Sequence, residues 1–367
     1  MLSAFCSITT VIEQKGSEMK LRKAGAIILL LITGCDQPDI EVVQSLAKFT
    51  PVEQRVESGK ANNIHSLIAW QNDKKVFELH RQGGGTVGDQ KTSNVPVGAN
   101  KLHNLHSVTK SFVATLIFIA IDEGKLADLD VPVLSLFPEY KQHDRVDKMA
   151  ITVRDVMNMS TGYALDELAT SVRRGSGNSF YRHYMAKDLQ AMFLGTELVF
   201  EPGSRFAYSG LSTVGLSKII ERLYGKPFAK VMREKLFEPL GIENYRWLTQ
   251  HGSNEPGADW GLMLSPLDMG KFGLMWLNRG QFNQQQLVAP HWFDELKSSR
   301  FFSYSMGYHL HFWQISQIGG AVAAVGIGEQ YIVMLPNEQA VIVATGGNYD
   351  MPSSPSLDTV RLLASLL

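Results

Sequence analysis

The stretch LHSVTKSFVATLIFIAIDEGKL, residues 105–126, sets a serine and a lysine close together at the front of a long apolar run. A run that is apolar on nearly every side predicts a buried helix over residues 105–121. Glu123-Gly124 then supplies a helix end, because glycine is the usual residue just past a helix. Ser107 and Lys110 would share one face of this helix.

The sequence allows two interpretations of Ser107 and Lys110. In the first, the serine is a nucleophile, and the free N–H groups and positive dipole end of the helix suit a developing oxyanion. Burial makes a lysine costly to charge, so its pKa can fall, and a neutral lysine can take the serine proton. In the second, Ser107 only caps the helix and Lys110 is solvated. The spacing alone does not decide, because Ser-x-x-Lys occurs three times in the chain.

Two later segments carry further candidate residues. Tyr208 and Gly210 lie in a turn before an amphipathic helix, where the phenol could pass a proton to a leaving group or could simply pack. Gly326 and Gly328 flank the start of a strand, and glycine lets a backbone come close to a substrate. The Ile327 N–H between them could stabilise an oxyanion, or the segment could be a simple turn into an edge strand.

The pattern of elements predicts an α+β fold. Strand patterns stand at both ends of the chain and helical patterns stand between them, so we expect an antiparallel sheet formed by both chain ends, flanked by helices, with an inserted all-helical lobe. The active site would lie between a sheet lobe, residues 61–104 plus 255–367, and a helical lobe, residues 105–254. The expected strands cover residues 66–82 (two strands around an Asn72-Asp73 turn), 308–314, 330–335 and 340–345, and the expected helices cover 105–121, 152–159, 187–194, 211–223, 228–237, 266–277 and 356–366.

The N-terminal region has the layout of a secretory signal. From Met19 it reads MKLRKAGAIILLLITGC, with basic residues, then an apolar run too short to span a bilayer, then Cys35. Residues 1–34 are therefore expected to be a signal peptide, which starts more naturally at Met19 than at Met1, and 35–60 a tether and first helix. The alternative is a buried apolar helix.

The small residues before Cys35 also resemble a bacterial lipoprotein signal. The resemblance implies cleavage before Cys35 and lipid on its sulfur, and so a protein anchored in the cell envelope and facing the periplasm. Asp36, directly after the cysteine, resembles an inner-membrane retention signal.

The composition narrows the range of partners and cofactors that the protein is expected to bind. The formal net charge is −1 and no basic tract occurs, which argues against nucleic acid as a partner. The two cysteines, Cys6 and Cys35, provide neither a disulfide framework nor a cysteine zinc site. No dinucleotide, phosphate-loop or zinc motif has its required context, so we expect no cofactor and no metal. Nothing in the pattern indicates an oligomeric state.

Taken together, several blocks give the chain a resemblance to the serine β-lactamase and penicillin-recognising superfamily. It is most similar to the class C β-lactamase-like branch, which includes esterases and 6-aminohexanoate-dimer hydrolases. The resemblance covers residues 66–367, and the order and spacing of the blocks make it specific. The blocks are LHSVTKSFVATLIFIAIDEGKLADLDVPVLSLFPEY, ITVRDVMNMSTGY, PGSRFAYSG, KPFAKVMREKLFEPLGIENYRW and WGLMLSPLDMGKFGLMWLNRGQF.

This resemblance implies a role for each matching position. Ser107 would be the nucleophile, Lys110 the base that activates it, and Tyr208 the residue that relays protons in acylation and deacylation. Ile327 stands where the branch supplies a backbone oxyanion N–H, with the Ser107 N–H as the other donor. Gly328 beside it and Gly210 in the second motif would line the substrate site.

The chain departs from the family pattern in two motifs. The second motif often ends in asparagine, but here it ends in Gly210. The third often carries lysine or histidine, then threonine and glycine, but here Gly326-Ile327-Gly328 is followed by Glu329. No cation is placed to hold the carboxylate of a β-lactam, and Glu329 would repel one if it faced the cleft.

These departures favour a serine hydrolase that acts through an acyl-enzyme on a small ester or amide lacking that carboxylate. Two alternatives remain open. The first is a β-lactamase or D-alanyl carboxypeptidase. The second is a catalytically weak envelope protein that captures peptidoglycan-like peptides or a partner. The loops 164–179 and 252–258 are expected to form the pocket walls.

Overall fold

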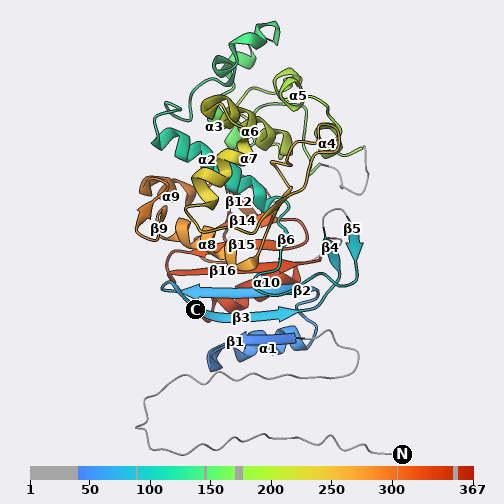
Figure 1. Ribbon diagram of the computed structural model, residues 1–367, viewed down its shortest axis with the longest axis vertical. Coiled ribbons are helices and arrows are strands. Elements are labelled where there is room, and N and C mark those ends of the chain that lie inside the picture. The colour runs from blue at the N-terminus through green and yellow to red at the C-terminus, as the bar shows by residue number, and fades with distance from the viewer. Residues whose placement is uncertain (1–39, 88–89, 144–146, 170–176, 304, 350–353) are drawn as a thin grey trace, which may run out of the picture.

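A nine-stranded antiparallel sheet forms the centre of the molecule (Figure 1). Its strand order is β1-β3-β2-β16-β15-β14-β13-β12-β11, so both ends of the chain contribute to one sheet. The predicted α+β fold is therefore confirmed. The computed structural model describes residues 40–87, 90–143, 147–169, 177–303, 305–349 and 354–367. The expected signal peptide and Cys35 lie outside these residues.

The strands of the large sheet are short to medium in length. They are β1 (Ile40–Gln44), β2 (Ile64–Gln71), β3 (Lys74–Arg81), β11 (Phe301–Ser303), β12 (Met306–His309), β13 (Phe312–Ile315), β14 (Ala321–Gly326), β15 (Gln330–Leu335) and β16 (Ala340–Gly346). Small ribbons complete the strand set: β4 (Gly85–Val87) with β5 (Gln90–Thr92), β9 (Gln281–Phe282) with β10 (Gln285–Gln286), and β6 (His103–Asn104), β8 (Leu262–Leu264) and β7 (Arg246–Trp247) together.

The first hairpin follows the sequence prediction. Asn72 and Asp73 join β2 to β3 with φ values of 50° and 60°, the left-handed pair that a two-residue hairpin turn needs. The segment before α1, expected to be a tether, contains β1, which pairs with β3 at the edge of the sheet.

One predicted strand is in fact two. Residues 308–314 were expected to be continuous, but the chain reverses at Leu310 and His311, whose φ values are 49° and 67°. The prediction was wrong because this turn contains no Gly, Asn or Asp to signal it. β12 and β13 consequently form a hairpin.

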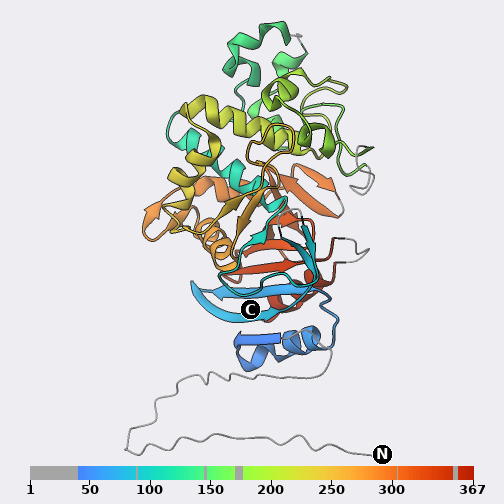
Figure 2. The same cartoon turned by 45° about the vertical axis from the view of Figure 1, so that its right-hand side comes forward.

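Helices cover both faces of the sheet and extend beyond it. Figures 1 and 2 place α3 to α6 at one end of the molecule and α1 with β1 at the other. The helices are α1 (Thr50–Glu57), α2 (Val108–Asp122), α3 (Val153–Met157), α4 (Phe180–Tyr184), α5 (Leu189–Gly195), α6 (Gly210–Tyr224), α7 (Phe228–Met232), α8 (Pro266–Leu277), α9 (Pro290–Leu296) and α10 (Pro355–Ala364), with a π turn at Arg233–Phe237 and 3-10 turns at Ala47–Phe49, Val133–Leu136, Pro138–His143 and Lys148–Ala150.

Two apolar cores lie on opposite faces of the sheet. One core contains alternate residues of β2, β15 and β16. Phe49 just before α1, Val52 of α1 and Val360 of α10 pack in the same core. The other core contains α2, α6 and α8. α2 is buried on nearly every side, as its apolar sequence predicts, so its first residues are held rigidly. None of the helices in the described part of the chain has the length and apolar character needed to cross a bilayer.

Candidate active site

Ser107 stands at the N-cap of α2, and its hydroxyl does not cap the helix. Lys110 lies one turn later with its side chain only 4% exposed. Its ammonium Nζ donates to Ser107 Oγ at 3.2 Å and to the main-chain oxygen of Asp259 at 2.7 Å. The interpretation of Ser107 as a helix cap with a solvated lysine is therefore wrong.

Tyr208 lies on the other side of Lys110. The Lys110 Nζ is 5.2 Å from the centre of the Tyr208 ring, and the phenol also interacts with Ser107. The ring packs against Tyr308 and Trp313, with centroid distances of 6.2 and 6.0 Å. Burial raises the pKa of Tyr208, against the opposing effects of Lys110 and Ser107. The structure thus brings together the three side chains proposed as catalytic.

The end of β14 lies against the start of α2. A Cβ on Gly326 would be 2.4 Å from the Leu105 carbonyl oxygen and 3.3 Å from the Ser107 nitrogen, so this approach requires glycine. Ile327 follows and is 47% exposed. Within the described ranges, neither the Ser107 N–H nor the Ile327 N–H has a hydrogen-bond acceptor. Two free donors therefore occur where two backbone segments meet.

Gly328 is also needed as glycine. Its φ is 82°, and a Cβ would be 2.4 Å from the ring of Tyr349. The next residue, Glu329, is 6% exposed. Its carboxylate accepts from Ser356 Oγ, in the first turn of α10, at 2.7 Å and from the Asn348 side-chain amide. The carboxylate is thus engaged at α10 and does not face the cleft.

Gly210 leaves room for an acidic side chain. A Cβ at this position would be 2.2 Å from Asp259 Oδ2 and 3.0 Å from His183 Cε1. The Gly210 N–H donates to Glu167 Oε1. The space that the family's asparagine would need is therefore filled by the buried carboxylate of Asp259.

The similarity to known proteins extends over the part of the chain that contains these site residues. A family model described as Beta-lactamase matches residues 65–365. The chain belongs to the β-lactamase family. Both the sequence-based recognition and the expected enzyme class, a serine hydrolase, agree with this membership.

Individual relatives of this β-lactamase family member are distant. Beta-lactamase-like protein 4 of Dictyostelium discoideum is 23% identical over 290 residues, covering 70% of this chain and 50% of that protein. The Beta-lactamase of Pseudomonas fluorescens is 27% identical over 158 residues, covering 42% and 39%. The chain spans half or less of the length of these curated relatives.

Solved structures share the fold. The octameric penicillin-binding protein homologue from Pyrococcus abyssi superimposes with a TM-score of 0.64 at 20% identity, covering 87% of this chain and 77% of that one. EstCE1, a hydrolase with promiscuous acyltransferase activity, gives 0.67 at 16% identity, covering 87% and 98%.

The charge on Lys110 differs from the sequence expectation. Burial lowers the pKa of this lysine, but Tyr208, Asp259 and Glu167 together outweigh burial, and the pKa is raised. These neighbours therefore favour the ammonium form of the lysine. The local sequence reveals only burial, so the direction of this shift could not be predicted from it.

Three site residues were missed from the sequence: Glu167, His183 and Asp259. His183 Nε2 lies 3.1 Å from Asp259 Oδ2, and Gln250 Nε2 donates to Asp259 Oδ1 at 3.0 Å. Burial opposes both charges, yet the pair raises the pKa of His183 and lowers that of Asp259, whereas burial raises the pKa of Glu167. A usable signal was Asp259 itself, an acid beside the apolar stretch WGLML, because buried charges need partners.

Two histidines near the motifs make contacts that hold neighbouring segments in place. His311 bonds the Met157 carbonyl through Nδ1 at 2.6 Å and Thr213 through Nε2 at 3.0 Å. His103 stacks on His65. Across the residues that the structure describes, no three His, Cys, Asp or Glu side chains converge as a metal site.

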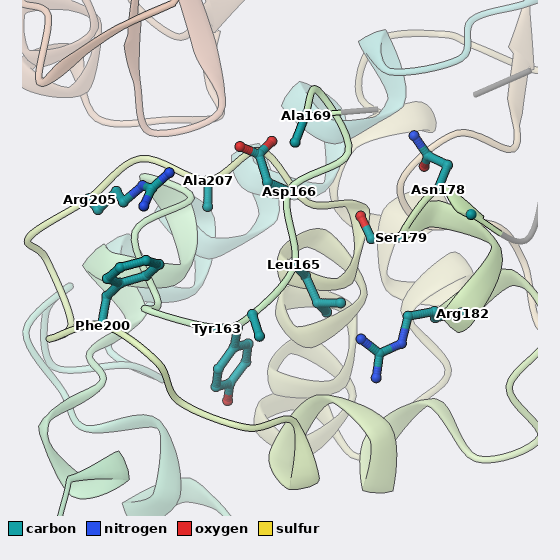
Figure 3. Close-up of a pocket in the computed structure, with 12 residues that line it drawn as sticks. Tyr163, Leu165, Asp166, Ala169, Asn178, Ser179, Arg182, Phe200, Arg205 and Ala207 are labelled. Carbon is teal, nitrogen blue, oxygen red and sulfur yellow. The ribbon is translucent and has the colours of Figure 1, made fainter. Parts of the chain in front are cut away.

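A cavity of about 380 Å³ lies beside the site. It is formed partly by residues between 164 and 169, which belong to the loop 164–179 expected to form a pocket wall. Figure 3 shows Arg205 and Phe200 on one side and Arg182 on the other, and the Arg205 guanidinium lies 4.5 Å from the Phe200 ring centre. Ser107, Lys110 and Tyr208 are not among its lining residues.

Proposed function

We propose that this β-lactamase family member hydrolyses a small ester or amide through an acyl-enzyme on Ser107. One observation carries the proposal: the Ser107 hydroxyl, free of any capping role, accepts from Lys110 at 3.2 Å and meets the Tyr208 phenol. A serine with two proton-handling neighbours and free backbone donors at a helix start suits acyl transfer.

Acylation would proceed as follows. Ser107 Oγ attacks the carbonyl carbon, and its proton passes to the Tyr208–Lys110 pair. The carbonyl π electrons move to oxygen, where the N–H groups of Ser107 and Ile327 stabilise the negative charge. Tyr208 then protonates the leaving alcohol or amine as its bond to carbon breaks. Water repeats the sequence on the ester of Ser107 and releases the acid.

The third motif supports this substrate class. Gly326, Ile327 and Gly328 offer no cation to a substrate carboxylate, and the Glu329 carboxylate is bound at α10. This supports an ester or amide without a carboxylate next to the scissile bond. β-Lactamase or D-alanyl carboxypeptidase activity is the alternative that the test must separate.

The test is intact-protein mass after incubation with a fluorophosphonate and, separately, with a penicillin, on wild type and Ser107→Ala. We expect a fluorophosphonate adduct on wild type alone, and no turnover by a folded Ser107→Ala. A penicillin adduct would move the substrate toward β-lactams or peptidoglycan stems. No adduct from either reagent on folded wild type would contradict the hydrolase and favour the binding-protein alternative.

The cellular location is also part of the proposal. We infer from the signal layout that the protein is a lipoprotein of the bacterial cell envelope, anchored through lipid on Cys35, facing the periplasm and held at the inner membrane by Asp36. Replacing Cys35 with alanine should move the protein from the membrane fraction to the soluble fraction of bacteria that express it. An unchanged distribution would contradict the anchor.

A further inference from the structure

Three buried ionisable side chains surround Gly210 and form a row from Glu167 through His183 to Asp259. His183 and Asp259 are fully buried and Glu167 is 9% exposed. His183 lies 3.1 Å from the Asp259 carboxylate and 4.0 Å from that of Glu167. Burying ionisable groups costs free energy unless they pair with one another. The close spacing of these three side chains therefore indicates that they act together in the site.

Lys110 lies next to Asp259, at one end of this row. The main-chain oxygen of Asp259 accepts from Lys110 Nζ at 2.7 Å, and its carboxylate Oδ2 lies 3.9 Å from the same nitrogen. The side chains of Asp259 and Lys110 are 0% and 4% exposed. At such a distance inside a protein the attraction between opposite charges is only weakly screened.

We propose that Asp259 is the positioning residue of Lys110: it occupies the space of the missing second-motif amide, fixes the lysine beside Ser107 and faces its positive charge with a carboxylate. This inference rests on the proposed hydrolase function. Neither the family pattern nor the sequence around Gly210 assigns such a role to Asp259, which lies 149 residues from Lys110 along the chain.

Among the carboxylates and histidines around Lys110, Asp259 is the group best placed for this role; Tyr208 also raises the pKa of Lys110, but it does so as a phenolate. Burial lowers the pKa values of His106 to about 4 and of His311 to about 3, so both rings stay neutral and add no positive charge beside Lys110. Burial raises the pKa of Glu167, so its carboxyl is less readily ionised and less able to balance the charge of Lys110. The titratable groups that act on Lys110 or respond to it are His106, before α2; Glu167, in the loop after α3; His183, on α4; Tyr208, before α6; Asp259, before β8; and His311, between β12 and β13.

A lysine that keeps its proton cannot take one from Ser107. The acceptor is then the Tyr208 phenolate, whose charge the Lys110 ammonium balances: the serine O–H bond breaks, the tyrosine O–H bond forms and the Ser107 Oγ bond to the substrate forms. Since burial raises the pKa of Tyr208, the reactive form of the Tyr208–Lys110 pair becomes more abundant as pH rises. The rate at Ser107 should therefore rise on the alkaline side.

The experiment measures the second-order rate of fluorophosphonate attachment to Ser107 against pH, in wild type, Asp259→Asn and Glu78→Gln. Without the carboxylate, Tyr208 and Glu167 oppose the burial of Lys110 less completely, so the Tyr208–Lys110 pair loses its proton at a lower pH. We expect the rising limb of Asp259→Asn to move down by about one pH unit or more. We expect its plateau to fall about 10- to 100-fold because the lysine is less well held.

Glu78→Gln is the matched control. Glu78 is 3% exposed on β3, and its carboxylate lies 3.0 Å from His80, so this variant also removes a buried acid from a histidine. Figure 1 places β3 far from α6. Its profile should superimpose on that of wild type. A folded Asp259→Asn with the wild-type limb and plateau would overturn the inference, whereas wild type that never reacts would overturn the hydrolase proposal instead.

A second set of variants tests the role of Asp259 even where Asp259→Asn folds poorly: an asparagine is introduced at position 210 and the Asp259 carboxylate is removed. Gly210→Asn alone would place its Cβ 2.2 Å from Asp259 Oδ2, but Asp259→Ala removes that obstacle. Coupled neighbours show non-additive effects, so we expect the Gly210→Asn/Asp259→Ala double variant to react about tenfold faster than Asp259→Ala. Equal rates for these two proteins would overturn the inference.

Discussion

The ring and the phenol oxygen of Tyr208 have separate tasks. The ring packs into a cluster with Tyr308 and Trp313, and the oxygen meets Ser107 and Lys110. Tyr208→Phe removes the oxygen and leaves the packing. We expect kcat/KM for a reactive ester to fall by about 10²- to 10⁴-fold, the usual contribution of a positioned acid or base. The free energy of unfolding should change by about 1 kcal/mol or less.

Tyr308→Phe is the control for this prediction. Its phenol is also buried, in the same cluster, and lies 3.4 Å from His311 Nδ1. The two variants should lose similar stability in urea unfolding, but only Tyr208→Phe should lose activity. A Tyr208→Phe enzyme as active as wild type would remove this phenol from the mechanism.

At the level of single residues, Lys110 shows what the sequence can predict and what it cannot. Burial at the front of an apolar helix could be read locally, and it correctly placed Lys110 beside Ser107. The opposing carboxylate comes from Asp259, 149 residues away, and no motif or period links the two. The position of Lys110 could therefore be predicted from the sequence, whereas the direction of its pKa shift could not.

Among the elements, α8 was predictable from local chemistry. The expected helix and the observed one both span Pro266–Leu277. Ser265 caps the helix by accepting from the Asp268 N–H at 3.1 Å, and Pro266 starts it. A cap, a proline at the first position and a helical period act together here, and all three can be read from sequence.

The β12–β13 hairpin depends on tertiary contacts instead. Asn158 Oδ1 accepts from the Leu310 N–H at 2.9 Å, and Met157 and Thr213 hold the His311 ring on both nitrogens. These contacts stabilise two non-glycine residues with positive φ, which local preference disfavours. Sequence pattern could not reveal a turn that distant side chains hold in place. The five-residue helix α4, which carries His183, was missed because it is too short to show a helical period.

On the scale of the whole molecule, buried neutral histidines make the fold sensitive to acid. Burial, with smaller effects from the nearby His65 and His80, lowers the pKa of His103 to about 3. Burial also lowers the pKa of His65 to about 4, against a hydrogen bond from its ring to Gly84. As pH falls, such imidazoles protonate first in the unfolded chain. Their contribution to the free energy of unfolding is therefore complete above pH 6.5 and is lost progressively toward pH 3.

His103→Leu tests this sensitivity, because leucine fills similar space and cannot be protonated. At pH 7.5 the variant should match wild type within about 1 kcal/mol. Between pH 7.5 and 4.5, wild type should lose about 2–3 kcal/mol more than the variant, the amount that a pKa of about 3 implies for one imidazole. Urea unfolding at both pH values measures the difference, with the exposed His291→Leu as the control that keeps the wild-type dependence. Identical pH dependence in His103→Leu and wild type would mean that acid acts elsewhere, with the buried carboxylates of the site as the next groups to substitute.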